Sequence, residues 1–318
     1  MTSVVAAHAA PAAAQSGDRY FRWLLIAMAA AVPLIMGAIL AVLLSAGWPA
    51  MQRFGLAFFV TSTWDPVAQE FGALPFIYGT LVSSALALLI AVPLGLGVAI
   101  FLSELAPGWL RVPVGFLVEL LAAIPSVVFG LWGIFVLVPW VRATLTPLLK
   151  SSLSFLPLFA GPPLGIGMLT AGLILAIMVV PFIVAVSTAV MRAVPITQRE
   201  AALALGATRW ETTRTAVLPY ARSGIIGAIF LALARALGET MAVTMVIGNV
   251  PQIKASLLAP AYTIPAVIAN EFTEATSDLY VAALIYAGVV LLIVTVIVNV
   301  VARVMVGRVA RGLAPIRE

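Results

Sequence analysis

The sequence lacks cysteine, contains a single histidine, and has charged side chains at only 9% of its 318 positions. Without cysteine there is no disulfide framework, no thiol nucleophile and no thiolate metal site. The histidine, His8, stands in an Ala-rich N-terminal segment, and we expect no role for it. Soluble domains carry about 25% charged residues, so this scarcity of charge excludes an ordinary soluble globular protein. We expect no catalytic residue, no metal site and no cofactor.

Apolar residues are correspondingly abundant, at 63% of the chain with a mean hydropathy of +1.17. A bilayer core of about 30 Å requires about 20 mostly apolar residues in a helix. Six stretches meet this requirement: 23–45, 76–101, 113–140, 166–190, 224–248 and 280–304. We therefore predict an all-α membrane protein with six transmembrane helices, whose internal prolines are tolerated because neighbouring helices satisfy the freed carbonyls.

The distribution of Lys and Arg predicts the orientation of these spans. Twelve cations lie in the two termini and in the loops 102–112 and 191–222, four lie in the opposite loops, and Arg235 lies inside a span. The positive-inside rule then places both termini in the cytoplasm. The net charge of +5 is explained by orientation, so it gives no support to nucleic-acid binding.

Two terminal tails flank the predicted membrane domain. Residues 1–18 are expected to be a disordered cytoplasmic tail, 19–310 the transmembrane domain and 311–318 a second cytoplasmic tail. Residues 1–18 have no Lys or Arg and so lack the basic region of a signal peptide. The outer loops are long and rich in proline, and they either dock an extracytoplasmic partner or pack over the bundle.

The cytoplasmic loop before the fifth span is predicted to form two short helices outside the membrane. Residues 197–205 have helix-forming composition, and Gly206 follows at the position of a C-terminal capping glycine. Thr208 and Glu211 have the spacing of a capping box that would begin the second helix. Pro219 is expected to end it.

The spacing of residues in this loop resembles the EAA motif of ABC importer membrane subunits, EAA-x3-G-x9-I-x-LP. The matching residues are Glu200, Ala201, Ala202, Gly206, Leu218 and Pro219, and Ala216 replaces the isoleucine. The resemblance implies a type I ABC importer permease fold in which the loop at about 195–220 docks into an ATP-binding subunit and transmits its closure. The alternative is an amphipathic loop that lies on anionic headgroups.

The fifth span contains two charged residues, Arg235 and Glu239. Their i,i+4 spacing places both on one face of a continuous helix. The apolar residues of this span contribute about −5 kcal/mol to insertion, and a central Arg with a Glu costs about +5 to +7 kcal/mol. The span should therefore be buried among other helices or line a watery cavity. A guanidinium matches the oxygens of an oxyanion, which favours an oxyanion pathway over the alternative, a structural ion pair.

Small residues recur every four positions along the same span, a pattern that permits close helix approach. They are Gly224, Ala228, Ala232, Ala236, Thr240, Thr244 and Gly248.

Three longer strings resemble the PstC family of phosphate-specific ABC permease subunits, over about residues 50–310. They are RALGETMAVTMVIGN from Arg235, ELLAAIPSVVFGLWGIFVLVP from Glu119, and FGALPFIYGTLVSSALALLIAVPLG from Phe71. The resemblance implies phosphate import through the bacterial inner membrane, with Arg235 and Glu239 in the pathway. It also implies three kinds of partner: a PstA-like second permease subunit, two PstB-like ATP-binding subunits and a PstS-like extracytoplasmic phosphate-binding protein.

Several alternatives remain open from the sequence. One alternative is that the substrate is another oxyanion, molybdate or sulfate. A second is that the chain is the sister subunit PstA, which has a related RA-GET motif. Outside this class, a gradient-driven transporter would require midplane coupling-ion sites, and a membrane scaffold or sensor would leave the charged pair without a ligand. The chain has no Walker glycine-lysine motif, so we expect that it is not an enzyme and does not hydrolyse ATP.

Overall fold

The structure, a computed structural model, describes residues 12–153 and 155–311. Six helical segments within them are long and apolar enough to cross a membrane: Asp18–Phe59, Leu74–Leu105, Ser126–Leu153, Met168–Arg192, Arg209–Gly238 and Asp278–Val304. The prediction of a six-span helical membrane protein is confirmed. Residues 1–11 and 312–318, which make up most of the two predicted tails, lie outside the described residues.

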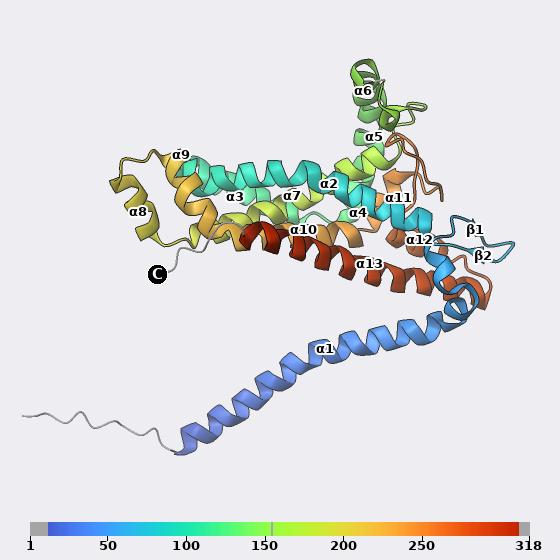
Figure 1. The fold of residues 1–318 in the computed structure, drawn as a ribbon, viewed down its shortest axis with the longest axis horizontal. Coiled ribbons are helices and arrows are strands. Elements are labelled where there is room, and N and C mark those ends of the chain that lie inside the picture. The colour runs from blue at the N-terminus through green and yellow to red at the C-terminus, as the bar shows by residue number, and fades with distance from the viewer. Residues whose placement is uncertain (1–11, 154, 312–318) are drawn as a thin grey trace, which may run out of the picture.

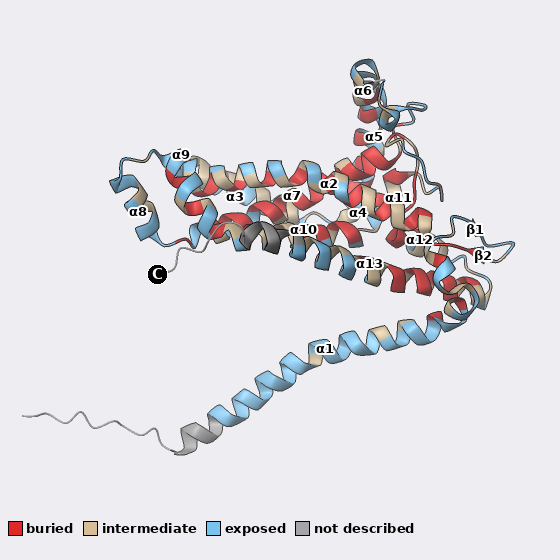
Figure 2. Ribbon diagram, viewed as in Figure 1, coloured by how far each residue is buried: buried red, intermediate tan, exposed pale blue. Residues whose placement is uncertain are grey.

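The first helix, α1 (Ala12–Phe54), leaves the bundle as a long arm (Figure 1). Its C-terminal part packs against α13 (Asp278–Arg311), where a Cβ added at Gly47 would lie 3.5 Å from the backbone nitrogen of Tyr286. The rest of its described surface is exposed and largely apolar (Figure 2). That surface requires lipid or another subunit to cover it.

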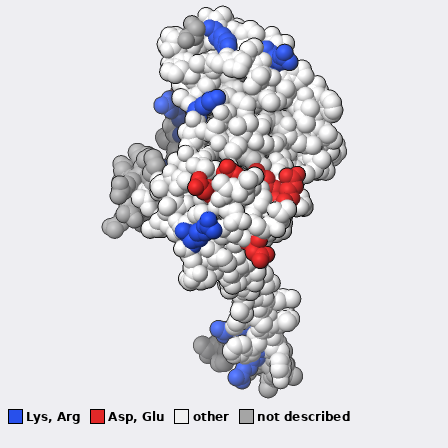
Figure 3. Space-filling model, turned by 90° about the vertical axis from the view of Figure 1, so that its right-hand side faces the viewer, with Lys and Arg blue, Asp and Glu red and all other residues white. Residues whose placement is uncertain are grey.

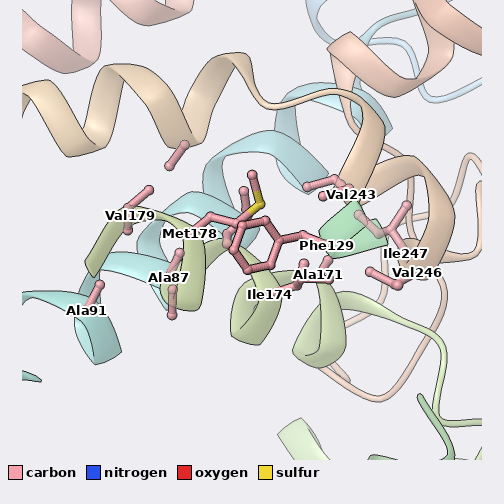
Figure 4. Packing of buried hydrophobic residues seen from close by; sticks show 14 of the residues in the cluster. Ala87, Ala91, Phe129, Ala171, Ile174, Met178, Val179, Val243, Val246 and Ile247 are labelled. Atoms are coloured by element: carbon pink, nitrogen blue, oxygen red, sulfur yellow. The ribbon is translucent and has the colours of Figure 1, made fainter. Parts of the chain in front are cut away.

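The centre of the bundle is formed by α2 (Leu74–Ile100) and α7 (Met168–Arg192), which pack side by side. A Cβ added at Gly95 would lie 2.9 Å from the Ile183 side chain, so the backbones approach closely there. Figure 4 shows the buried residues at this contact, with Ala87 and Ala91 of α2 beside Met178 and Val179 of α7. Close packing of small and branched side chains in this way holds membrane helices together.

The prediction that the third span is one helix over residues 113–140 is wrong. The helix α3 (Gly108–Ala123) ends before Ile124 and Pro125, which are both extended, with ψ of 127° and 143°. Proline disfavours helical backbone in the residue before it. After the break the chain packs closely against α11 (Met241–Ile247), where a Cβ added at Gly133 would lie 2.8 Å from the Val246 side chain.

After this break the chain stays helical into the region predicted as an outer loop. The segments are α4 (Ser126–Trp132), a π-helical turn (Gly133–Leu137), α5 (Val138–Trp140), a second π-helical turn (Val141–Leu145), α6 (Thr146–Leu153) and, further on, a 3-10 turn (Pro157–Phe159).

The loop predicted to be cytoplasmic and the fifth span also differ from the prediction. Their segments are α8 (Ile196–Ala204), α9 (Arg209–Thr212), a π-helical turn (Thr213–Val217), α10 (Leu218–Gly238) and α11 (Met241–Ile247). The expectation that Pro219 ends the second short helix is wrong, because α9 runs through the π-helical turn into α10 without a break. The π-helical turn directly before Pro219 is a local adjustment of the kind that lets a helix accommodate a proline.

The opposite end of the molecule is closed by short elements with aromatic side chains. They are η1 (Gly55–Phe59), β1 (Trp64–Asp65), β2 (Glu70–Phe71) and α12 (Ile264–Glu271). The strands pair antiparallel with Trp64 opposite Phe71, and Phe58 stacks on Tyr286 of α13 at a centroid distance of 4.4 Å. In Figure 1 this end and the α8–α9 end lie at opposite extremes of the bundle.

Candidate functional site

The fifth span breaks at the residue predicted to line the pathway. The helix α10 ends at Gly238, Glu239 is extended with ψ of 126°, and Thr240 precedes α11. Polar side chains replace lost backbone hydrogen bonds at this point. The Thr240 hydroxyl donates to the Gly238 carbonyl at 3.3 Å, and the Glu239 carboxylate accepts from the Ala242 amide at 3.5 Å. Local bonds of this kind offer the backbone an alternative to the helix.

The prediction of a continuous helix with Arg235 and Glu239 on one face is therefore wrong. Because the helix ends between them, the i,i+4 spacing does not bring their side chains together. In the described residues a single salt bridge forms, and it joins Arg199 to Glu104 instead.

Arg235 has an aromatic partner in place of a carboxylate. Its guanidinium carbon lies 4.3 Å from the ring centroid of Phe182 in α7, a cation–π contact. Its Nε is buried and has no hydrogen-bond partner in the described structure. Phe182 lies near the middle of α7, so the guanidinium sits at middle depth in the bundle. One face of the cation is covered and its N–H edge retains bonding capacity.

The predicted stripe of small residues lies beside this arginine. Ala228, Ala232 and Ala236 are buried, and a Cβ added at Gly224 would collide with Val190 of α7. These residues let α10 approach α7 closely. The remaining members of the predicted stripe lie beyond the break.

The turn between α8 and α9 has the predicted chemistry. Gly206 has a φ of +87°, its amide donates to the Leu203 carbonyl at 2.9 Å, and the next amide, of Ala207, donates to Ala202 at 3.2 Å. This pair of bonds is a Schellman motif, in which glycine occupies the left-handed position. Thr208 and Glu211 form the reciprocal capping box, with bonds of 2.7 and 3.3 Å.

The residues of the EAA pattern gather on this loop, at the end of the bundle. Glu200, Ala201, Gly206 and Pro219 are exposed, while Ala202 and Leu218 are half-buried. Large apolar side chains are exposed beside them: Ile196, Leu203, Leu205 and Trp210. Figure 2 shows α8 as a largely exposed element that projects from the bundle.

The structure thus separates the predicted site residues into two groups: Arg235 and Glu239 in the fifth span, and the residues of the EAA pattern at the end of the bundle. Arg235 lies about 26 Å along α10 from Leu218, at 1.5 Å per residue. Any action of the loop on Arg235 must therefore pass through helices. The sequence pattern predicted no role for two residues that lie beside these groups: Phe182, which packs against Arg235, and Arg199, which precedes Glu200.

The end of the bundle that carries β1, β2 and α12 combines packed aromatics with surface acids. The Glu271 carboxylate accepts hydrogen bonds from the Trp64 indole at 2.7 Å and the Tyr280 hydroxyl at 2.6 Å. Burial raises the pKa of the Tyr262 phenol, which accepts from Asn270 at 3.0 Å. Figure 3 shows acidic side chains gathered across this face. The described residues contain no group of three or more His, Asp or Glu side chains placed to hold a metal ion.

Comparison with known proteins identifies a family. Residues 91–314 match the family described as binding-protein-dependent transport system inner membrane component. A phosphate transport system permease protein PstC from Mesorhizobium japonicum is 50% identical over 92% of this chain and 90% of its own length. The PstC protein of Haemophilus influenzae is 45% identical over 86% of this chain and 88% of its own length.

Solved structures share the fold at low sequence identity. A chain of a bacterial alginate ABC transporter in complex with an alginate-bound periplasmic protein matches with a TM-score of 0.60 and 19% identity, over 92% of this chain and 97% of that one. A chain of the MetNI methionine ABC transporter in an inward-facing conformation matches with a TM-score of 0.53 and 18% identity, over 75% and 94%. These likenesses confirm the ABC importer permease fold. The chain is a multi-pass membrane protein that belongs to the binding-protein-dependent transport system inner membrane components and, among them, to the PstC family of phosphate transport system permease proteins.

Proposed function

We propose that this chain is a permease subunit of an ATP-driven importer of inorganic phosphate, in the bacterial inner membrane with both termini in the cytoplasm. The relatives named above carry this activity in their names. The orientation follows from the excess of cations on one set of loops. In this proposal the chain performs no hydrolysis, and a separate ATP-binding subunit supplies the energy.

The observation that carries the proposal is the bonding state of Arg235. A cation inside a membrane domain is costly unless it is paired, and in the described residues this one lies against the face of Phe182 and forms no salt bridge. A guanidinium offers several N–H donors in a plane that matches phosphate oxygens. Contact with an aromatic face leaves that plane's edge available for a passing anion.

Glu239 follows Arg235 closely in the chain and contributes a carboxylate near the break. A carboxylate further along the same pathway disfavours tight retention of an anion, because like charges repel. A conducting site must release what it binds. In this proposal Arg235 attracts phosphate and Glu239 limits how long it stays.

The EAA-like loop is the proposed contact with the ATP-binding subunit. Its exposed glutamate, small residues and apolar side chains form a projecting surface that a cleft can enclose. The proposed assembly contains a PstA-like second permease subunit, two PstB-like ATP-binding subunits and a PstS-like extracytoplasmic phosphate-binding protein. The acidic outer face disfavours capture of free phosphate, so delivery by a binding protein fits its charge.

The test is phosphate uptake by vesicles that contain the assembled transporter. Arg235→Gln should lower the initial rate by about a hundredfold or more, the loss expected when two charge-assisted hydrogen bonds are removed. Arg222→Gln, which removes a charge from the same helix, is the matched control and should retain uptake. Near-normal uptake by Arg235→Gln in fully assembled complexes would contradict the pathway role.

The same assay separates the alternatives. Uptake should require ATP on the cytoplasmic side and persist when ion gradients are collapsed, whereas a gradient-driven transporter would show the reverse. Molybdate and sulfate in excess should compete weakly with labelled phosphate. Strong competition by either would assign the pathway to that oxyanion.

A further inference from the structure

The cytoplasmic loop is fastened to the membrane domain by Arg199, the residue before Glu200. Its Nε and one terminal nitrogen donate to the two carboxylate oxygens of Glu104 at 3.2 and 2.9 Å. The guanidinium also donates to the backbone carbonyls of Val194 at 2.6 Å and Met191 at 2.7 Å. We call this set of four bonds the Arg199–Glu104 bridge.

The bridge joins three elements at one point. Arg199 lies in α8, Met191 lies in the last turn of α7, and Glu104 lies in the π-helical turn Phe101–Leu105 at the end of α2. The last carbonyls of a helix lack their usual partners within it, and Arg199 gives the Met191 carbonyl of α7 a donor in addition to the Val194 amide, which lies 3.2 Å away. π-helical turns recur at functional positions, and this one places the Glu104 carboxylate toward the loop.

A second arginine holds the same turn from the other side. Arg111 of α3 donates to the carbonyls of Ser103 and Ala106 at 3.4 and 3.3 Å. The Ser103 hydroxyl lies 3.4 Å from the Met191 sulfur. The turn after α2 is therefore fixed to α3, α7 and α8 together.

Burial distinguishes this bridge from an ordinary surface ion pair. The side chains of Arg199 and Glu104 are only 21% and 10% exposed. Exposed pairs contribute little, because solvent screens them and both side chains must be ordered. Here the guanidinium donates two hydrogen bonds to one carboxylate and further bonds to backbone carbonyls. Paired hydrogen bonds of this kind fix the relative orientation of the two side chains and also stabilise the contact.

We propose that Arg199 is a positioning residue, which carries displacement of α8 into α2 and α7 through the Arg199–Glu104 bridge. α7 is the helix that holds Phe182 against Arg235, and Phe182 lies about 15 Å from the Arg192 end at 1.5 Å per residue. A continuous helix thus connects the bridge to the arginine in the membrane. The role rests on the proposed docking of α8 to an ATP-binding subunit.

The test compares Arg199→Gln and Glu104→Gln with Arg192→Gln in the assembled transporter. Arg192 is an exposed arginine at the same junction that forms no salt bridge in the described residues. The two bridge variants should retain the ATP-binding subunit and ATP hydrolysis, yet their phosphate uptake per ATP hydrolysed should fall about tenfold. Arg192→Gln should match the parent protein.

A distance measurement reports the position of α8 directly. Because the chain has no cysteine, spin labels on Thr197→Cys and Val112→Cys would be the only labels on it. The distance distribution between α8 and α3 should be narrow in the parent and broaden with Arg199→Gln but not with Arg192→Gln. An unchanged distribution, or a loss of uptake that merely follows loss of assembly, would overturn the positioning role. A parent complex without phosphate uptake would contradict the proposed function, while the distance distribution would still decide the bridge.

Discussion

Two arginines of this chain are held in opposite ways. Arg199 forms four hydrogen bonds, two of them to a carboxylate, and ties the α8 loop to the bundle. Arg235 lies deeper, against the face of Phe182, with a buried Nε that has no partner in the described structure. A bonded arginine fixes geometry, whereas one with open donors can bind a ligand. We therefore propose force transmission for Arg199 and anion passage for Arg235.

Below the hundredfold loss expected for Arg235→Gln, the next largest effect is expected at the turn that presents Arg199. Gly206 adopts a left-handed conformation, which costs a branched side chain about 1–2 kcal/mol. Gly206→Leu should therefore lower uptake per assembled complex by up to about thirtyfold, as the α8–α9 angle is lost. Gly206→Asn, which tolerates this conformation, is the control. Equal uptake by the two variants would mean that the Arg199–Glu104 bridge alone sets the position of α8.

A double-mutant cycle should show an intermediate effect at the bridge. Arg199→Gln and Glu104→Gln remove the same contact, so the double variant should lose about tenfold in uptake, no more than either single variant. Two independent residues would instead lose about a hundredfold together. Uptake rates normalised to assembled transporter distinguish the two results.

The smallest effect on uptake is expected from substitution of Phe182, whose ring packs against Arg235. Phe182→Leu keeps an apolar side chain but removes the aromatic face, and cation–π contacts contribute about 0.5–2 kcal/mol. The phosphate concentration for half-maximal uptake should change by about threefold or more. Phe182→Tyr keeps the face and should change little. If both variants gave the same phosphate concentration for half-maximal uptake, the aromatic face of Phe182 would have no role at the site.

Local signals in the sequence were sufficient for the turn chemistry. Gly206 and the Thr208–Glu211 capping box depend on residues within one turn of each other, and the structure confirms them. The six spans also follow directly from apolar runs. These features require no knowledge of distant contacts.

The helix breaks and the long-range hydrogen bonds could not be predicted from local sequence patterns. Pro125 breaks its span, whereas Pro93 and Pro181 lie inside continuous helices, so a proline in an apolar run does not by itself predict a break. The break at Glu239 involves no proline and depends on side-chain bonds to the backbone. Arg199 and Glu104 are 95 residues apart, so only the fold brings them together.

The most direct measurement concerns the two charges of the fifth span. Arg235→Gln and the double variant Arg235→Gln/Glu239→Gln should be compared for phosphate uptake in assembled transporters. If Arg235 serves the passing anion, removing Glu239 as well cannot restore uptake, and both variants should stay about a hundredfold or more below the parent. If the two charges instead only offset each other within the span, removing both should return uptake toward the parent rate. Such recovery would contradict the pathway role of Arg235.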